Sequence, residues 1–261
     1  MRQAAADPVA LMPVPGSSPA PVPPVNGVGL TVSVPGQVVR SVIWGQPVFF
    51  TVTNPGDLIQ SHHARGEFYE PEELEIIRRW CPPGAVFADI GSNIGNHALF
   101  AAKFLMAAKV ILFEPNPAAI SILLSNLALN GVLDRCDTAH LGIGLSDGRA
   151  EGLSIRAQPM NLGGGKLVKG SGTGTLEVRP GDDMLLDAAP TFLKIDVEGM
   201  EIAVLTGLEQ TIARHRPTMF VEVDNRNRPA MEEWIATHRY TVQATFRRYR
   251  TNENLLLLPQ G

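Results

Sequence analysis

The sequence predicts an α/β protein with a mostly parallel, twisted sheet, helices on both of its faces and one antiparallel strand near the C-terminus. From residue 86 onward, short apolar runs typical of strands alternate with segments of helical spacing. Such alternation implies right-handed crossovers between parallel strands. The last two apolar runs, 240–246 and 254–258, are separated by too few residues for a helical crossover, so we expect them to pair as a hairpin.

Each expected element has its own signal. Pro71 suits a first helical position, Leu74, Ile77 and Trp80 follow at helical spacing, and a Pro-Pro-Gly sequence at 82–84 ends the helix. A small β segment is expected before it, from β-branched runs at 31–34, 38–44 and 48–53. The remaining expected strands are 86–90, 109–114, 138–145, 191–197 and 218–223, and the remaining expected helices are 96–107, 117–130, 200–214 and 229–238.

Composition narrows the class of protein. The 261 residues carry a formal charge of −4, which gives no basic footprint for nucleic acid. Two cysteines form neither a disulfide framework nor a zinc cluster, so we expect a cytoplasmic protein. No signal peptide and no apolar run long enough for a membrane span is predicted. We expect a disordered Pro/Ala-rich tail at 1–26, a small β extension at 27–60 and the main domain at 61–261.

The segment FADIGSNIGNHALF, at 87–100, has the pattern of a loop that holds a nucleotide. The dinucleotide fingerprint fails there, because Asn93 and Asn96 stand where its second and third glycines belong. Asn93 tolerates a positive φ better than most residues, so the turn after Gly91 remains possible. Glu114 ends the next strand, where a carboxylate can accept both hydroxyls of a ribose.

Asp89 indicates which nucleotide-containing cofactor this loop holds. A carboxylate would repel a pyrophosphate, whereas it would attract the sulfonium and amino group of S-adenosylmethionine, which has no phosphate. We therefore expect S-adenosylmethionine as the cofactor. For Asn96 and Asn116 a helix N-cap is the alternative to cofactor contact. The expected cofactor contacts are Asp89, Gly91, Asn93, Gly95, Asn96, Glu114, Pro115, Asn116, Ser146 and Asp196.

Five motifs stand out along the chain: DIGSNIGNH at 89–97, FEPNP at 113–117, GLSDG at 144–148, LKIDVEGME at 193–201 and the lead-in GEFYEPEEL at 66–74. Together they resemble the FkbM family of S-adenosylmethionine-dependent methyltransferases. Ser92 and Gly144 stand where the family usually has alanine. The resemblance, over roughly 57–225, implies a Rossmann-like class I methyltransferase fold for 61–261. It also implies that a hydroxyl on a small molecule, sugar or natural product is methylated, and that Glu70 closes over the cofactor. The alternative for Glu70, which precedes Pro71, is a favourable charge at the helix N-terminus.

Three carboxylates are the candidate catalytic residues. Asp196 and Glu198 lie two apart at the end of a strand, so both face the same side, and Glu222 ends the next strand. Asp196 is the first candidate for the base that takes the hydroxyl proton, with Glu198 and Glu222 behind it. The alternative for Asp196 and Glu198 is a pair of caps for the following helix, and the alternative for Glu222 is a solvent-exposed strand end.

Other readings stay open. Carboxylates of this kind would suit magnesium, but we predict no metal site. Asn161 and the glycines at 163–165 are expected in a loop, either a flap over the acceptor or solvent-exposed. The rival functions are a nicotinamide-dependent oxidoreductase and a non-catalytic interaction module.

Overall fold

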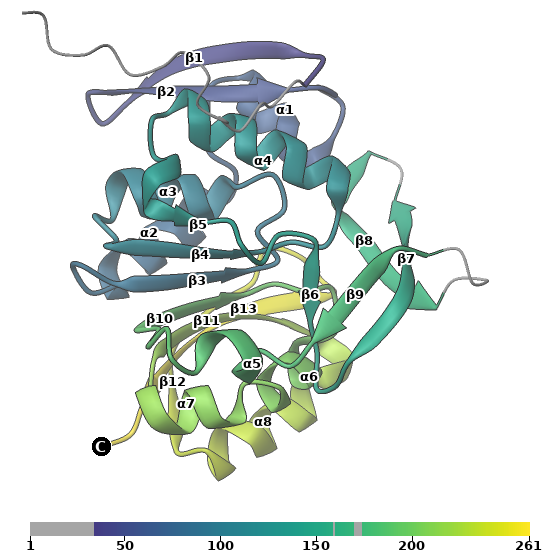
Figure 1. Cartoon of the computed structure of the whole chain (residues 1–261). Helices are drawn as coiled ribbons and strands as arrows, with labels where there is room; N and C mark the ends of the chain where they lie inside the picture. Colours follow the sequence, from purple (N-terminus) through teal and green to yellow (C-terminus); the bar gives the residue numbers. More distant parts are fainter. Residues whose placement is uncertain (1–33, 159, 170–173) are drawn as a thin grey trace, which may run out of the picture. The chain divides into compact units, whose positions relative to one another are not determined.

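The computed structural model describes residues 34–158, 160–169 and 174–261, so the expected tail at 1–26 lies outside the described residues. Its central sheet has the strand order β12-β13-β11-β10-β3-β4-β5 (Figure 1). Neighbouring strands are parallel except at β13, which is antiparallel to both β11 and β12, as predicted for the C-terminal hairpin. The bounds are β3 Val86–Ile90, β4 Lys109–Phe113, β5 Cys136–Asp137, β10 Phe192–Ile195, β11 Thr218–Asp224, β12 Tyr240–Phe246 and β13 Asn252–Pro259.

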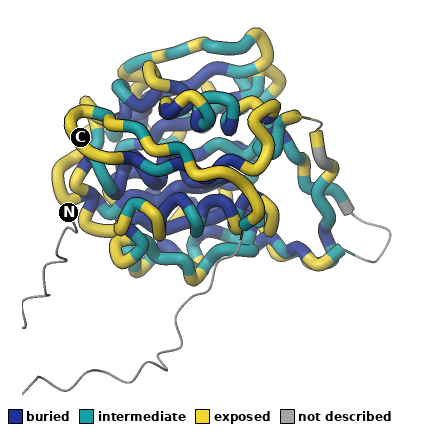
Figure 2. Tube along the Cα trace, turned by 90° about the horizontal axis from the view of Figure 1, so that it is seen from above, coloured by how far each residue is buried: buried dark blue, intermediate teal, exposed yellow. Residues whose placement is uncertain are grey.

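Helices cover both faces of this sheet (Figure 1). Side chains alternate along each strand, so Phe87 belongs to one apolar cluster and Ala88 to the cluster on the opposite face. The buried strands form the dark interior in Figure 2. One face carries α2 Pro71–Trp80, α3 Asn96–Phe104 and α4 Pro117–Leu129, and the other carries α5 Asp182–Leu185, α6 Glu201–Thr206, α7 Glu209–His215 and α8 Arg228–Thr237.

The N-terminal β segment is a hairpin, β1 Gln37–Ile43 with β2 Gln46–Val52. Phe50 is fully buried, and the Thr51 amide donates to Asn126 Oδ1 on α4 at 2.7 Å, so the hairpin packs on that helix. Of the expected run at 31–34, only Val34 is described. A short helix that the sequence did not predict, α1 Leu58–Ala64, follows the hairpin and is capped by the Asp57 side chain.

Two expectations about 138–165 are wrong. The chain does not form one strand over 138–145, because Gly142 turns at φ +93° and the strand β6 Ile143–Leu145 leaves the central sheet. The glycines at 163–165 lie in a strand, not in a loop. The four strands of this second sheet, in the order β6-β9-β7-β8, are β6, β9 Leu176–Arg179, β7 Ala150–Gln158 and β8 Asn161–Lys169.

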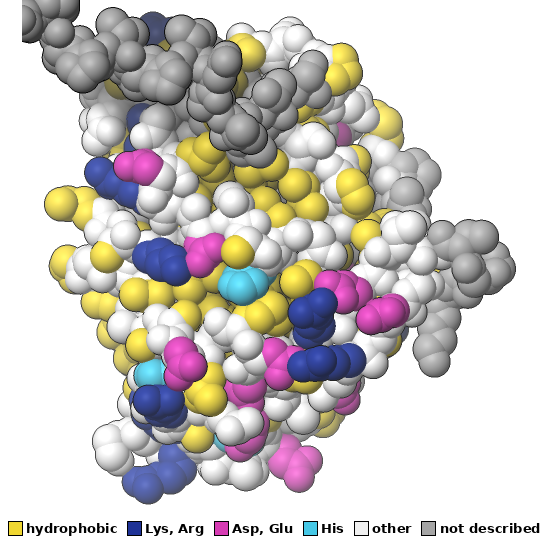
Figure 3. Space-filling view, in the orientation of Figure 1, with side chains coloured by type: hydrophobic (Ala, Val, Ile, Leu, Met, Phe, Trp, Pro, Cys, Tyr) yellow, Lys and Arg dark blue, Asp and Glu magenta, His cyan; other side chains and the backbone are white. Residues whose placement is uncertain are grey.

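The expected helix at 200–214 is instead two helices, α6 and α7. They break at Gly207, where an added Cβ would overlap the backbone of Ser146. On the face shown in Figure 3, acidic and basic side chains are interspersed. Within the described ranges, no helix is both long enough and apolar enough to cross a membrane.

Candidate functional site

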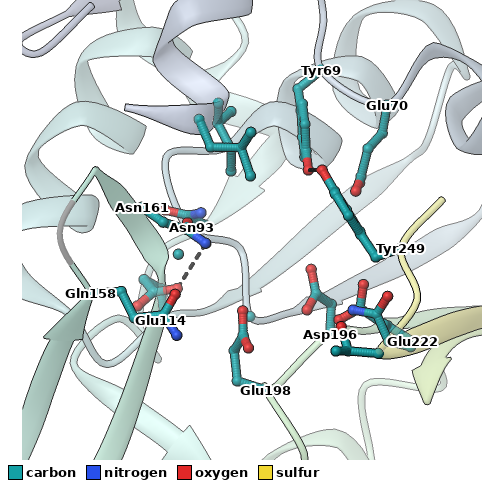
Figure 4. A pocket seen from close by; sticks show the side chains of 16 residues that line it. Tyr69, Glu70, Asn93, Glu114, Gln158, Asn161, Asp196, Glu198, Glu222 and Tyr249 are labelled. Atoms are coloured by element: carbon teal, nitrogen blue, oxygen red, sulfur yellow. Dashed lines mark hydrogen bonds between the residues drawn. The ribbon is translucent and has the colours of Figure 1, made fainter. Parts of the chain in front are cut away.

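The candidate site lies at the carboxyl ends of β3, β4, β10 and β11, where α/β sheets hold their ligands. Two cavities meet there. The acidic cavity, of about 270 Å³, is lined by Glu70, Glu114, Asp196, Glu198 and Glu222 (Figure 4). The apolar cavity, of about 160 Å³, is lined by Ile90, Phe113, Leu145, Leu167, Val197 and Met200. Both cavities share Gly91, Glu114, Gly163, Asp196 and Glu198.

The turn after β3 forms part of the floor of both cavities. Gly91 adopts φ +80°, and a Cβ at this position would overlap the carbonyl oxygen of Asp196, so only glycine fits. Asn93 adopts φ +48°, which confirms the expectation that it takes the positive φ of this turn. The Ser92 hydroxyl donates to the carbonyl of Asp89 at 2.8 Å and closes the turn.

Glu114 is held by this turn and by the start of α4. Its Oε2 accepts a hydrogen bond from the Asn93 amide at 2.7 Å, and its Oε1 accepts one from the Asn116 amide at 2.8 Å. Burial raises the pKa of Glu114 to about 7, although both amides oppose that shift. The carboxylate therefore lies where the two cavities meet, in a fixed orientation.

Asp89 does not line either cavity. It is fully buried, with one carboxylate oxygen 3.5 Å from Lys194 Nζ. Lys194 and Asp89 are register partners on β10 and β3, and Lys194 Nζ also donates to the carbonyl of Gly91 at 2.9 Å and to Asp196 Oδ2 at 3.3 Å. The sequence reasoning missed Lys194. This lysine, and not the cofactor, compensates the negative charge of Asp89.

The other carboxyls of the acidic cavity repel one another. Burial and the nearby Asp196 raise the pKa of Glu222 to about 10 and that of Glu70 to about 8. Burial and Asp196 also raise the pKa of Glu198 to about 7. Glu198 adopts φ +52°, a strained conformation for a residue other than glycine. The structure thus brings Asp196, Glu198 and Glu222 together, as the sequence predicted, and adds Glu70 to the same cavity.

Four further expected contacts lie off the cavity walls. Asn96 bonds both backbone groups of Tyr69, with 2.9 Å from its Oδ1 to the amide and 2.9 Å from its Nδ2 to the carbonyl. Asn116 caps α4 through the Ala118 amide, the alternative considered for it. Gly95 packs against Leu123, and the Ser146 hydroxyl bonds Asp147. Pro115, in contrast, lines the apolar cavity.

Residues far apart in the chain cover the acidic cavity. The hydroxyls of Tyr69 and Tyr249 meet at 2.5 Å, and both side chains line the cavity (Figure 4). Arg248 ties the same segment to α2, with its guanidinium 2.6 Å from Glu73 Oε2 and 2.5 Å from Glu72 Oε2. We call Tyr69, Tyr249 and the Arg248 ion pairs the clasp. Sequence reasoning missed the clasp because no motif marks it.

The second sheet adds uncharged side chains to the wall. Gln158 at the end of β7 and Asn161 at the start of β8 both line the acidic cavity, close to Asn93 and Glu114 (Figure 4). His97, on α3, is also buried, with Nε2 3.7 Å from Glu70 Oε2, and burial keeps its pKa well below the ordinary value. Among the described residues, no group of three or more His, Cys, Asp or Glu side chains is arranged to hold a metal ion.

Known proteins resemble the chain in sequence and in fold. The model of the methyltransferase FkbM domain matches residues 89–248. Hexuronic acid methyltransferase AglP of Haloferax volcanii is 28% identical over 173 residues, covering 64% of this chain and 67% of AglP. Methyltransferase sdnD of Sordaria araneosa is 27% identical over 207 residues, covering 61% of this chain and 78% of sdnD. The crystal structure of methyltransferase FkbM from Methylobacillus flagellatus KT has a TM-score of 0.46 and 22% identity, over 66% of this chain and 43% of that chain.

Proposed function

Because the chain belongs to the FkbM methyltransferase family, we propose that it moves a methyl group from S-adenosylmethionine to a hydroxyl of a small molecule, sugar or natural product. One observation carries the proposal. Gly91, Glu114 and Asp196 line both cavities, so one ligand can extend from the apolar cavity into the acidic cavity. The apolar cavity suits an aromatic base, and the acidic cavity suits a cation.

The residues present fit S-adenosylmethionine. Phe113, Leu145 and Val197 offer apolar walls for adenine. The Glu114 carboxylate would accept the ribose hydroxyls, and the backbone at Gly91 lets the methionine portion approach closely. Bound there, S-adenosylmethionine supplies a methyl group already activated by its sulfonium. The acidic lining disfavours a pyrophosphate, because like charges repel.

The chain's own carboxylates would orient the acceptor and take its proton. Asp196 is the first candidate for the base, since it lines both cavities and is anchored by Lys194. Glu222 is a poorer base at neutral pH, because its raised pKa of about 10 keeps it protonated. Glu198, with a pKa of about 7, is a better base than Glu222 at neutral pH. Holding the acceptor oxygen in line with the methyl carbon is the larger part of the catalysis.

Glu114→Ala tests the seat of the cofactor. Hydrogen bonds to a charged group contribute about 1.5–3 kcal/mol each, so we expect S-adenosylhomocysteine to bind at least about 10-fold more weakly by calorimetry. The control is Glu151→Ala, which removes an exposed carboxylate far from both cavities. Unchanged affinity in Glu114→Ala would remove the ribose assignment.

Asp196→Asn tests the base. We expect it to lower turnover about 100-fold or more in a methyl transfer assay, in the range typical of a positioned base, and to change S-adenosylhomocysteine affinity much less. Asp187→Asn, at a side chain 96% exposed, is the matched control. Equal losses of turnover and affinity would make Asp196 a binding residue instead.

A further inference from the structure

The acidic cavity has no cation to offer an acceptor. All its charged side chains are carboxyls, and within the described part of the chain no lysine, arginine or histidine lines it. Of the nearby cations, Lys166 lines the adjoining apolar cavity and acts on the charge of Glu198, and two others are already engaged. Lys194 is held by Asp89, Asp196 and the Gly91 carbonyl, and Arg248 is held by Glu72 and Glu73. Within the acidic cavity, a carboxylate or phosphate on the acceptor would therefore meet like charge from five carboxyls and no cation in the lining that the structure describes.

The rest of the polar lining suits hydroxyl groups. Sugar hydroxyls both donate and accept hydrogen bonds, as amide and hydroxyl side chains do. The uncharged polar side chains of the acidic cavity are Tyr69, Asn93, Gln158, Asn161, Tyr249, Thr251 and Asn252. Of these, Asn93 Oδ1 is buried without a hydrogen-bond partner among the described residues. Several uncharged donors and acceptors thus surround the carboxyls.

Glu70 points to a donor on the ligand. It is only 8% exposed, and its side chain points into the acidic cavity toward Asp196 and Glu222 (Figure 4). Among the described residues, its carboxyl group makes no hydrogen bond, and His97 stays 3.7 Å away. Because this carboxyl group lines the cavity and has no protein partner there among the residues that the structure describes, it is free to accept a hydrogen bond from a hydroxyl or amine of the acceptor.

We propose that the acceptor is a sugar hydroxyl on a neutral or amine-bearing sugar, and that the acidic cavity rejects a sugar carrying a carboxylate. This inference rests on the proposed methyl transfer. The acceptor oxygen forms a bond to the methyl carbon as the carbon–sulfur bond breaks, the electron pair goes to sulfur, and the Asp196 carboxylate takes the hydroxyl proton. The relative AglP, by its name, acts on a hexuronic acid. The inference therefore gives the two proteins acceptor sugars of different charge.

The test compares matched sugars. The full-length protein is given labelled S-adenosylmethionine and the p-nitrophenyl glycosides of glucose, glucosamine, glucuronic acid, galactose and galacturonic acid, and methylated product is quantified by mass spectrometry. We expect kcat/KM at least 10-fold higher for a neutral or amine-bearing glycoside than for the uronic acid of the same series, with the ratio shrinking at high salt. Glu198→Gln should narrow that ratio, and Glu151→Gln, on the exposed surface, should leave it unchanged.

Two results would overturn the inference. One is faster transfer to a uronic acid than to its neutral partner. The other is no transfer to any of the five glycosides while S-adenosylhomocysteine binds, which removes the sugar class and leaves the methyltransferase proposal standing. If S-adenosylhomocysteine does not bind either, the proposed function fails with it.

Discussion

The buried pair of Lys194 and Asp89 allows a sharp prediction. Lys194 is 4% exposed, Asp89 is fully buried, and they lie 3.5 Å apart. Burial opposes the charged form of Lys194, but Asp196 and Asp89 outweigh it and raise its pKa above the ordinary value. Lys194→Met would leave the Asp89 carboxylate buried without its cation. Breaking a buried pair in this way costs about 3–5 kcal/mol of the free energy of unfolding.

Urea unfolding followed by circular dichroism measures this loss. With a slope of about 1–3 kcal/mol per molar urea, the midpoint of Lys194→Met should fall by at least about 1 M. The double variant Lys194→Met/Asp89→Asn removes both charges and should recover most of the midpoint. A deficit of about 1 kcal/mol should remain, because the Gly91 carbonyl loses its donor.

The control is Lys109→Met, which breaks an exposed pair with Asp137 at 2.7 Å and should cost no more than about 1 kcal/mol. A single Lys194→Met variant as stable as the wild type would refute the ion pair. A double variant no more stable than the single one would show that packing, and not the uncompensated charge, explains the loss.

Three further outcomes are expected. Glu222 keeps its proton up to a pKa of about 10 in the folded state, whereas the unfolded state releases it near the ordinary value of 4.5. The wild type should therefore lose stability as pH rises from 5 to 8, and Glu222→Gln, which carries no such proton, should gain on it by up to about 1.4 kcal/mol per pH unit in thermal unfolding. Gly91→Ala should lose more stability than Gly84→Ala, since both have positive φ but only Gly91 would overlap backbone; equal losses would contradict the clash. Tyr249→Phe should raise KM for the acceptor and leave S-adenosylhomocysteine affinity unchanged, and a shift in that affinity would place Tyr249 at the cofactor.

The sequence predicts most of the central sheet and the cluster of carboxyls. Parallel strands of one sheet have their carboxyl ends at the same edge, so residues at or just beyond those ends, such as Glu114, Asp196 and Glu222, are expected to meet in space. The positive φ at Asn93 was predictable for a different reason, because it depends only on the local turn that follows Gly91. Local chemistry and chain topology are both readable from residue order.

Lys194 was predictable but overlooked. A lysine within an apolar strand is rarely buried without a partner, and its spacing of two from Asp196 places both on one face. The register between β10 and β3, which brings Asp89 opposite Lys194, depends on how strands far apart in the chain align. The expectation that Asp89 faces the cofactor failed to consider that partner.

The second sheet and the clasp were not predictable in the same way. Strand β8 carries glycines at 163–165 in place of alternating apolar residues, so it has no strand pattern. In the structure, β7 supplies the cross-strand partners of β8. The β7 side chains Gln158 and Ile155 leave little room for a Cβ at positions 164 and 165. The clasp pairs residues 180 apart in the chain, and no periodicity reports such a contact.

The clasp also has a consequence for how the protein matures during translation. Tyr69 and the turn at Gly91 leave the ribosome long before Tyr249, which lies between β12 and β13. The contact between the two tyrosine hydroxyls can therefore form only after the loop between β12 and β13 has been synthesised, whatever part of the central sheet has already assembled. Closure of the acidic cavity by the clasp is accordingly a late event in the synthesis of this domain.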